Sequence, residues 1–229
     1  MTKVKICGLR KLDDALAAAS AGAAFLGIVF EPHSRRFLEV EYARSLVRSF
    51  RARWDKMEPR WVGVFANQPL EEVNDLLTYC DIDLAQLSGD ESPDYCFQVV
   101  RPVVKAIHIK GDIHSEEEKE AVICSMIGYK DNGQMCMLDT FSQNTLGGTG
   151  EVFNWEVAIG LARDHSFFLA GGLSAENVSE AMSQVRPWGV DVSSGVETNG
   201  QKDRSKIIQF MAEVKRTDEV LTSRPEASL

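Results

Sequence analysis

Short apolar runs alternate with longer amphipathic segments along almost the whole chain. The apolar runs are rich in Val, Ile and Phe, which favour strands, and cover residues 4–7, 25–30, 61–66, 84–87, 103–109, 135–139, 167–170 and 189–193. The segment after each run has the spacing or the composition of a helix, and these segments cover residues 12–21, 40–51, 70–79, 91–99, 115–127, 154–162, 175–184 and 206–215. The pattern therefore predicts eight strand–helix pairs.

Strands that alternate with helices pair in parallel through right-handed crossovers. Eight such pairs in about 200 residues predict an α/β fold, a single (β/α)8 TIM barrel that forms a catalytic domain over residues 1–216. An open doubly wound sheet is the alternative, but that fold usually has fewer strands and a glycine-rich first turn. The polar stretch 217–229 follows the last helix and is expected to be a frayed tail.

Composition excludes several classes of protein. The 229 residues carry a formal net charge of −9, which argues against broad nucleic-acid binding. No apolar run is long enough for a secretory signal or a membrane span, so a cytoplasmic protein without a membrane partner is expected. The cysteines have no regular spacing and the histidines do not cluster, so we expect neither disulfides nor a metal site. Four cysteines are interpreted as packing residues, namely Cys80, Cys96, Cys124 and Cys136.

Residues at the carboxyl ends of barrel strands form the active-site face, which makes Cys7, Gln86 and Asp139 candidates, together with Arg36 in the second loop. Cys7 could act as a base if nearby positive charge lowered its pKa, or it could be a buried structural thiol. Asp139 could be a general acid, or a carboxylate that caps the following turn. Arg36 could hold a carboxylate through two hydrogen bonds, or be a solvated surface residue.

Two turns of small residues follow the seventh and eighth strands. One contains Gly171 and Gly172, and the other contains Ser193, Ser194 and Gly195. Tight turns expose backbone N–H groups that can bind phosphate, and many barrels bind phosphate at these two loops. The alternative is that the glycines only permit left-handed turns. Asp191, in the last strand, could order these loops from below.

Several motifs, in their order and spacing, resemble the phosphoribosylanthranilate isomerase family over about residues 3–215. They include KICGLR at 5–10, GIVFEPHSRRF at 27–37, VGVFANQPLEEV at 62–73, AQLSGDE at 85–91, LDT at 138–140, LAGGLSAENV at 169–178 and GVDVSSGVE at 189–197. In the fourth of these motifs Ser88 stands where the family usually has histidine. The resemblance adds a specific reaction to the barrel prediction.

The resemblance implies an isomerase of tryptophan biosynthesis, which converts N-(5′-phosphoribosyl)anthranilate to 1-(2-carboxyphenylamino)-1-deoxyribulose 5-phosphate by an Amadori rearrangement. It implies that Cys7 is the general base at C2′, Asp139 the general acid at the ring oxygen, and Arg36 the ligand of the anthranilate carboxylate. The remaining expected substrate-binding residues are Gln86, Asp191, Gly171, Gly172, Ser193, Ser194 and Gly195. No electrons are transferred, so no cofactor is expected. The expected partner is a small phosphorylated sugar, and the chain is expected to be a monomer or a homodimer.

Three other functions are weighed against this one. The histidine-pathway isomerase family uses an aspartate at the end of the first strand, where this chain has Cys7. Indole-glycerol-phosphate synthase would need a catalytic lysine near the start of the barrel and a longer N-terminal extension. A non-catalytic phosphate-binding barrel would keep the phosphate turns but lose the acid–base pair, whereas this sequence has both.

Overall fold

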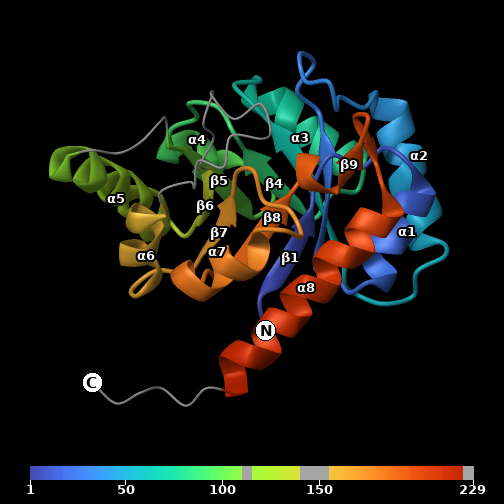
Figure 1. Ribbon diagram of the computed structural model, residues 1–229. Helices are drawn as coiled ribbons and strands as arrows, with labels where there is room; N and C mark the ends of the chain where they lie inside the picture. Colours follow the sequence, from blue (N-terminus) through green and yellow to red (C-terminus); the bar gives the residue numbers. More distant parts are fainter. Residues whose placement is uncertain (110–114, 140–154, 224–229) are drawn as a thin grey trace.

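The computed structural model describes residues 1–109, 115–139 and 155–223 (Figure 1). Eight parallel strands form a closed barrel in sequence order, and β8 pairs with β1. The strands are β1 Lys3–Ile6, β2 Phe25–Val29, β3 Arg60–Phe65, β4 Leu84–Leu87, β5 Val103–His108, β6 Met135–Asp139, β7 Phe167–Ala170 and β8 Gly189–Val192. The TIM barrel prediction is confirmed, and each expected strand agrees with the observed one to within one residue at either end.

Helices alternate with the strands and surround the barrel (Figure 1). They are α1 Leu12–Ser20, α2 Val40–Arg51, α3 Leu70–Tyr79, α4 Pro93–Gln98, α5 Glu116–Asp131, α6 Glu156–Ala162, α7 Val178–Val185 and α8 Arg204–Ser223. A 3₁₀ turn, η1 Ser194–Val196, and a short hairpin, β9 Glu197–Thr198 with β10 Gln201–Lys202, lie between β8 and α8. These additions place charged residues beside the carboxyl end of β8.

The frayed tail expected from residue 217 is wrong for residues 217–223, which continue α8. Thr217 and Asp218 are buried there. The backbone N–H of Thr2 donates to Asp218 Oδ2 at 2.8 Å, and the Thr2 hydroxyl donates to Oδ1 at 2.7 Å. These bonds fix the N-terminus against α8 (Figure 1), so the polar side chains that suggested a tail form a contact. Residues 224–229 lie outside the described residues.

Side chains alternate between two layers because successive strand residues point to opposite faces. Outward residues such as Ile6 and Leu138 pack with the helices, whereas inward residues such as Val104 and Met137 form a separate cluster inside the barrel. This alternation puts a ring of polar and thiol side chains on the inner face, near the carboxyl ends of the strands. The ring comprises Cys7, Gln86, His108 and Asp139.

All five cysteines are free. Cys80, Cys96 and Cys136 are buried, as expected of packing residues, but Cys124 is exposed on α5, so the packing interpretation is wrong for that residue. No described helix is both long and apolar enough to cross a membrane. Across the described ranges, no group of His, Cys, Asp and Glu side chains could hold a metal ion.

Candidate active site

Cys7 lies just after β1, buried on the inner face in contact with Val29 and Val64. Gly27 on the adjacent strand provides the space for the thiol, because a Cβ at that position would lie 3.0 Å from the sulfur. Lys5 is two residues earlier on the same face and is buried below Cys7. Its Nζ donates to Asp191 Oδ1 at 2.8 Å, so a buried ion pair supports the thiol from beneath.

The positive charges that could lower the pKa of Cys7 are present, but burial outweighs them. Burial raises the pKa of the Cys7 thiol; Lys5 opposes this, Asp191 reinforces it, and Lys202 opposes it more weakly. For Lys5, burial acts to lower the pKa, but the charges of Asp191 and Cys7 prevail and raise it. Lys5 therefore stays protonated beside the thiol. The thiolate, when it forms, has an ammonium next to it.

Asp139 ends β6, and its side chain is 32% exposed at the mouth of the barrel. His108 ends β5 directly opposite it in the strand register. His108 Nδ1 lies 3.5 Å from Asp139 Oδ2, and His108 Nε2 lies 2.8 Å from the backbone carbonyl oxygen of Ser88. The hydrogen bond to Asp139 raises the pKa of His108, although burial opposes it.

Arg36 reaches the mouth from the loop after β2. Gly8 has φ +76°, and a Cβ there would lie 2.5 Å from Arg36 Cδ, so only glycine lets the arginine side chain pass. Arg36 donates from Nε and Nη2 to the two carboxylate oxygens of Glu197, at 2.6 and 3.0 Å. With its side chain only 19% exposed, Arg36 is not a solvated surface residue.

Glu197 is the centre of this cluster. Besides Arg36, it accepts from Lys202 Nζ at 2.8 Å, and the same ammonium donates to the Ser193 carbonyl at 2.8 Å. Burial acts to raise the pKa of Glu197, but the hydrogen bonds from Arg36 and Lys202 lower it to about 2. The cluster thus joins the β2 loop to the turn after β8.

Glu197→Gln is expected to reduce the acid sensitivity of the fold. Glu197 has a pKa of about 2 in the folded protein, against an ordinary value of 4.5. Its ionised form therefore stabilises the folded state fully above about pH 4.5, and this contribution, about 3 kcal/mol, is lost as the pH falls towards 2. Urea unfolding from pH 6 to pH 2.5 should show a smaller loss of stability in the variant than in the wild type. Equal losses would mean that Glu197 titrates at its ordinary pKa.

Gln86 is buried on the inner face of β4. Its Nε2 donates to Ser88 Oγ at 3.1 Å, but its Oε1 accepts no hydrogen bond among the described residues. Buried polar atoms are almost always hydrogen-bonded. An unpaired acceptor at the mouth of the barrel therefore suits a ligand that donates a hydrogen bond.

The two glycine-containing turns follow β7 and β8, which are neighbouring strands, and they pack against each other. Gly171 and Gly172 have φ values of +96° and +64°, both in the left-handed region. A Cβ on Gly195 would overlap the carbonyl oxygen of Leu173, so the second turn needs a glycine to approach the first. Ser193 Oγ donates to the Cys7 carbonyl at 3.2 Å, which ties this pair of turns to the end of β1.

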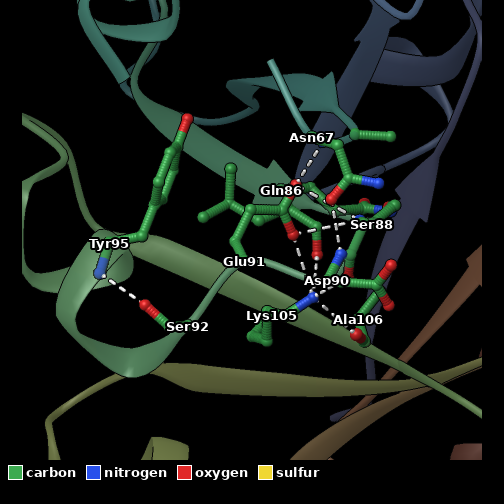
Figure 2. A network of polar contacts seen from close by, with 12 residues as sticks. Asn67, Gln86, Ser88, Asp90, Glu91, Ser92, Tyr95, Lys105 and Ala106 are labelled. Carbon is green, nitrogen blue, oxygen red and sulfur yellow. Dashed lines mark hydrogen bonds and ion pairs between the residues drawn. The ribbon is translucent and has the colours of Figure 1, made fainter. Parts of the chain in front are cut away.

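A buried ion pair fixes the loop between β4 and α4, behind the inner face (Figure 2). Lys105 Nζ lies 3.0 Å from Glu91 Oε2 and also donates to backbone carbonyls that include those of Leu87 and Gly89. Glu91 accepts from the backbone N–H groups of Asn67 and Gly89 at 2.8 and 3.0 Å. Both ends of the loop are thus held, and with them the Ser88 carbonyl that faces His108.

The sequence predicts Cys7, Asp139, Arg36 and the two turns as site residues, and the structure gathers them around one end of the barrel. The sequence pattern does not point to the charged partners Lys5, Glu197 and Lys202, or to the histidine His108. Two signals were available. The pattern Lys5-Ile6-Cys7 puts a lysine on the same strand face as the thiol, and His108 is the last residue but one of the fifth apolar run.

Comparison with known proteins gives the family. The model of the N-(5′-phosphoribosyl)anthranilate (PRA) isomerase family matches residues 4–213. The chain is 39% identical over 218 residues to the N-(5′-phosphoribosyl)anthranilate isomerase of Dehalococcoides mccartyi, covering 95% of this chain and 98% of that protein.

Solved structures of phosphoribosylanthranilate isomerases resemble this chain as well. One comes from Thermotoga maritima and contains monomers generated from a dimeric phosphoribosylanthranilate isomerase; it has a TM-score of 0.77 and 31% identity, covering 94% of this chain and 100% of that one. Another is a phosphoribosyl anthranilate isomerase in complex with reduced 1-(o-carboxyphenylamino)-1-deoxyribulose 5-phosphate, with a TM-score of 0.75 and 32% identity, covering 94% and 100%. The chain belongs to the N-(5′-phosphoribosyl)anthranilate isomerase family, the isomerases of tryptophan biosynthesis.

Proposed function

We propose that this chain isomerises N-(5′-phosphoribosyl)anthranilate with Cys7 as the general base and Asp139 as the general acid. The observation that carries the proposal is the gathering of a buried thiol, a carboxyl group and two glycine-containing turns at one end of the barrel. Cys7 directly follows β1 and Asp139 ends β6, with β7 and β8 between these two strands. A sugar held above β7 and β8 would have the Cys7 thiol on one side and the Asp139 carboxyl group on the other.

The reaction requires two proton transfers on opposite sides of the sugar. Asp139 gives a proton to the ring oxygen as the C1′–O bond breaks and the anilino nitrogen forms an iminium. The Cys7 thiolate then takes the proton from C2′, and the C2′–H electron pair neutralises the iminium to give an enolamine. The enolamine becomes the ketone by moving a proton from the C2′ hydroxyl to C1′. Cys7 then releases its proton to solvent and Asp139 takes one from solvent, so atoms and charge balance.

The high pKa of Cys7 has two opposing effects on this step. Burial keeps the thiol mostly protonated, so only a small fraction of the enzyme carries the thiolate. A thiolate of higher pKa is, however, a stronger base towards carbon. The protonated Lys5 beside it stabilises the anion at the moment it is needed.

Anchors at both ends of the substrate would fix the ribose between acid and base. The turns at Gly171–Gly172 and Ser193–Gly195 suit the phosphate, because small residues let backbone N–H groups approach an anion. Arg36 would hold the anthranilate carboxylate with its outer N–H groups, since Nε and one N–H of Nη2 bind Glu197. The unpaired Gln86 Oε1 suits a ribose hydroxyl. Asp191 acts from below, through Lys5.

The expected partners are this sugar phosphate and, at most, a second copy of the chain. The Thermotoga relative is named as dimeric. We expect the chain to act in the cytoplasm, where thiols stay reduced, because the structure has five free cysteines.

The experiment that tests the substrate is turnover of freshly generated phosphoribosylanthranilate, followed by the loss of its fluorescence. The wild-type chain should consume it and leave the aminoimidazole substrate of histidine biosynthesis unchanged. Consumption of the histidine-pathway substrate alone would assign the chain to the sister activity.

Asp139→Asn is expected to lower kcat by about 10²-fold, near the low end for loss of a general acid. The reason is exposure: the Asp139 side chain is 32% exposed, so water can partly replace it as a proton donor. Steady-state kinetics measure the loss, and binding of the reduced product analogue serves as the control for an intact site. A variant with unchanged kcat would exclude Asp139 as the acid.

A further inference from the structure

The hydrogen bonds of His108 determine where its protons lie. Nε2 is 2.8 Å from the Ser88 carbonyl oxygen, which can only accept, so Nε2 carries a hydrogen. A neutral imidazole with its proton on Nε2 has a lone pair on Nδ1, and Nδ1 faces Asp139 Oδ2 at 3.5 Å. An ionised carboxylate has no hydrogen to give to that lone pair.

The contact between Nδ1 and Oδ2 is therefore attractive only when one proton lies between the two groups. Either His108 is an imidazolium facing a carboxylate, or neutral His108 faces a protonated Asp139. The two arrangements contain the same number of protons, so the two groups share one proton.

We propose that His108 is a positioning residue that holds a proton against Asp139 Oδ2, from where Asp139 passes it to the substrate. The proposal rests on the proposed function, in which Asp139 protonates the ring oxygen of the sugar. The Ser88 carbonyl sets the tautomer of His108, and His108 in turn orients Oδ2 and shares its proton with it. After Asp139 has protonated the substrate, a proton from solvent reloads the pair.

The groups around His108 agree with this arrangement. Asp139 on β6 and the Ser88 carbonyl after β4 both favour the imidazolium, whereas burial and the positive charge of Lys105 oppose it. Lys105 is itself paired with Glu91, so its charge is largely compensated. Among the described residues, Asp139 is thus the charged group that favours a second proton on His108.

The first test is direct and needs no turnover. NMR titration of the imidazole C2 proton, assigned by its absence in His108→Gln, should show His108 with a pKa above its usual 6.5 in the wild type. In Asp139→Asn the pKa should fall to about 6.5 or below, because an amide cannot carry the negative charge. A His108 pKa that is the same in both proteins would overturn the shared proton.

The second test is the pH dependence of the rate. His108→Gln should have at least roughly tenfold lower kcat than the wild type at about pH 7.5, and the two should converge as the pH falls to about 5, where solvent supplies protons more readily and His108 is no longer needed to hold one. A ratio that stays constant over this range would indicate a merely structural role and overturn the proposal. Ser88→Ala keeps the carbonyl that faces His108 but removes the hydroxyl that accepts from Gln86, so it is the control for the shape of the pH dependence: its kcat relative to the wild type should stay constant over this range.

The two tests separate the failure of this proposal from the failure of the proposed function. If the wild type does not turn over phosphoribosylanthranilate, the function is wrong, and the NMR titration still decides whether the proton is shared. If turnover is normal but His108 titrates independently of Asp139, the function stands and the role of His108 is rejected.

Discussion

Cys7→Ala is expected to lower kcat/KM by about 10⁴-fold, which corresponds to about 5.5 kcal/mol of transition-state stabilisation. The thiol is buried, so water cannot readily enter to take the C2′ proton in its place. The substitution removes only the sulfur atom, and the neighbours Val29 and Val64 are apolar, so the variant should fold. The measurement is turnover of phosphoribosylanthranilate beside binding of the reduced product analogue, which should be retained.

Two further variants make the Cys7 result specific. Cys136→Ala removes an equally buried thiol that faces outward from β6, away from the mouth, and should leave kcat/KM within about twofold of the wild type while costing some stability. Cys7→Ser retains a polar atom, but its hydroxyl is a far weaker acid than a thiol, so its activity should stay near that of Cys7→Ala. Turnover within roughly tenfold of the wild type in Cys7→Ala would reject Cys7 as the base.

The strands and most of the helices could be predicted because hydrophobic periodicity is a local property. The end of α8 could not, since its polar residues are fixed by a contact with the other end of the chain: Thr2 donates to Asp218. Sequence spacing does not show that the two segments meet. For the same reason the sequence does not reveal the role of Glu197, which accepts hydrogen bonds from Arg36 although it lies 161 positions further along the chain.

The strand-end rule found the residues that face the mouth, but it could not give their electrostatics. For Cys7, the sequence shows a possible base but not whether charge or burial controls its pKa. For His108, it shows a histidine at a strand end, whereas the proton argument needs both the register with Asp139 and the position of the Ser88 carbonyl. Both depend on which strands pair: β1 with β8 for Cys7, and β5 with β4 and with β6 for His108.

Lys105→Met is expected to lower the free energy of unfolding by about 4 kcal/mol, the range for breaking a buried ion pair. Lys105 and Glu91 are 3% and 5% exposed, in the layer between barrel and helices. The methionine fills the space but leaves the Glu91 carboxylate without its cation (Figure 2). It also leaves the carbonyls of Leu87 and Gly89 without this donor. In a chain of this length the melting temperature should fall by roughly 10 °C.

The double variant Glu91→Gln with Lys105→Met decides whether an uncompensated charge causes the loss. The amide oxygen of the introduced glutamine would still accept hydrogen bonds from the backbone N–H groups that Glu91 binds, but the amide carries no charge. The double variant should therefore recover a large part of the roughly 4 kcal/mol. A double variant that is less stable than Lys105→Met would show that the carboxylate is satisfied by the N–H groups of Asn67 and Gly89 alone. The same loop carries the Ser88 carbonyl, so this carbonyl should hold His108 less firmly in the folded Lys105→Met variant. The turnover of that variant should therefore fall by more than its unfolded fraction explains.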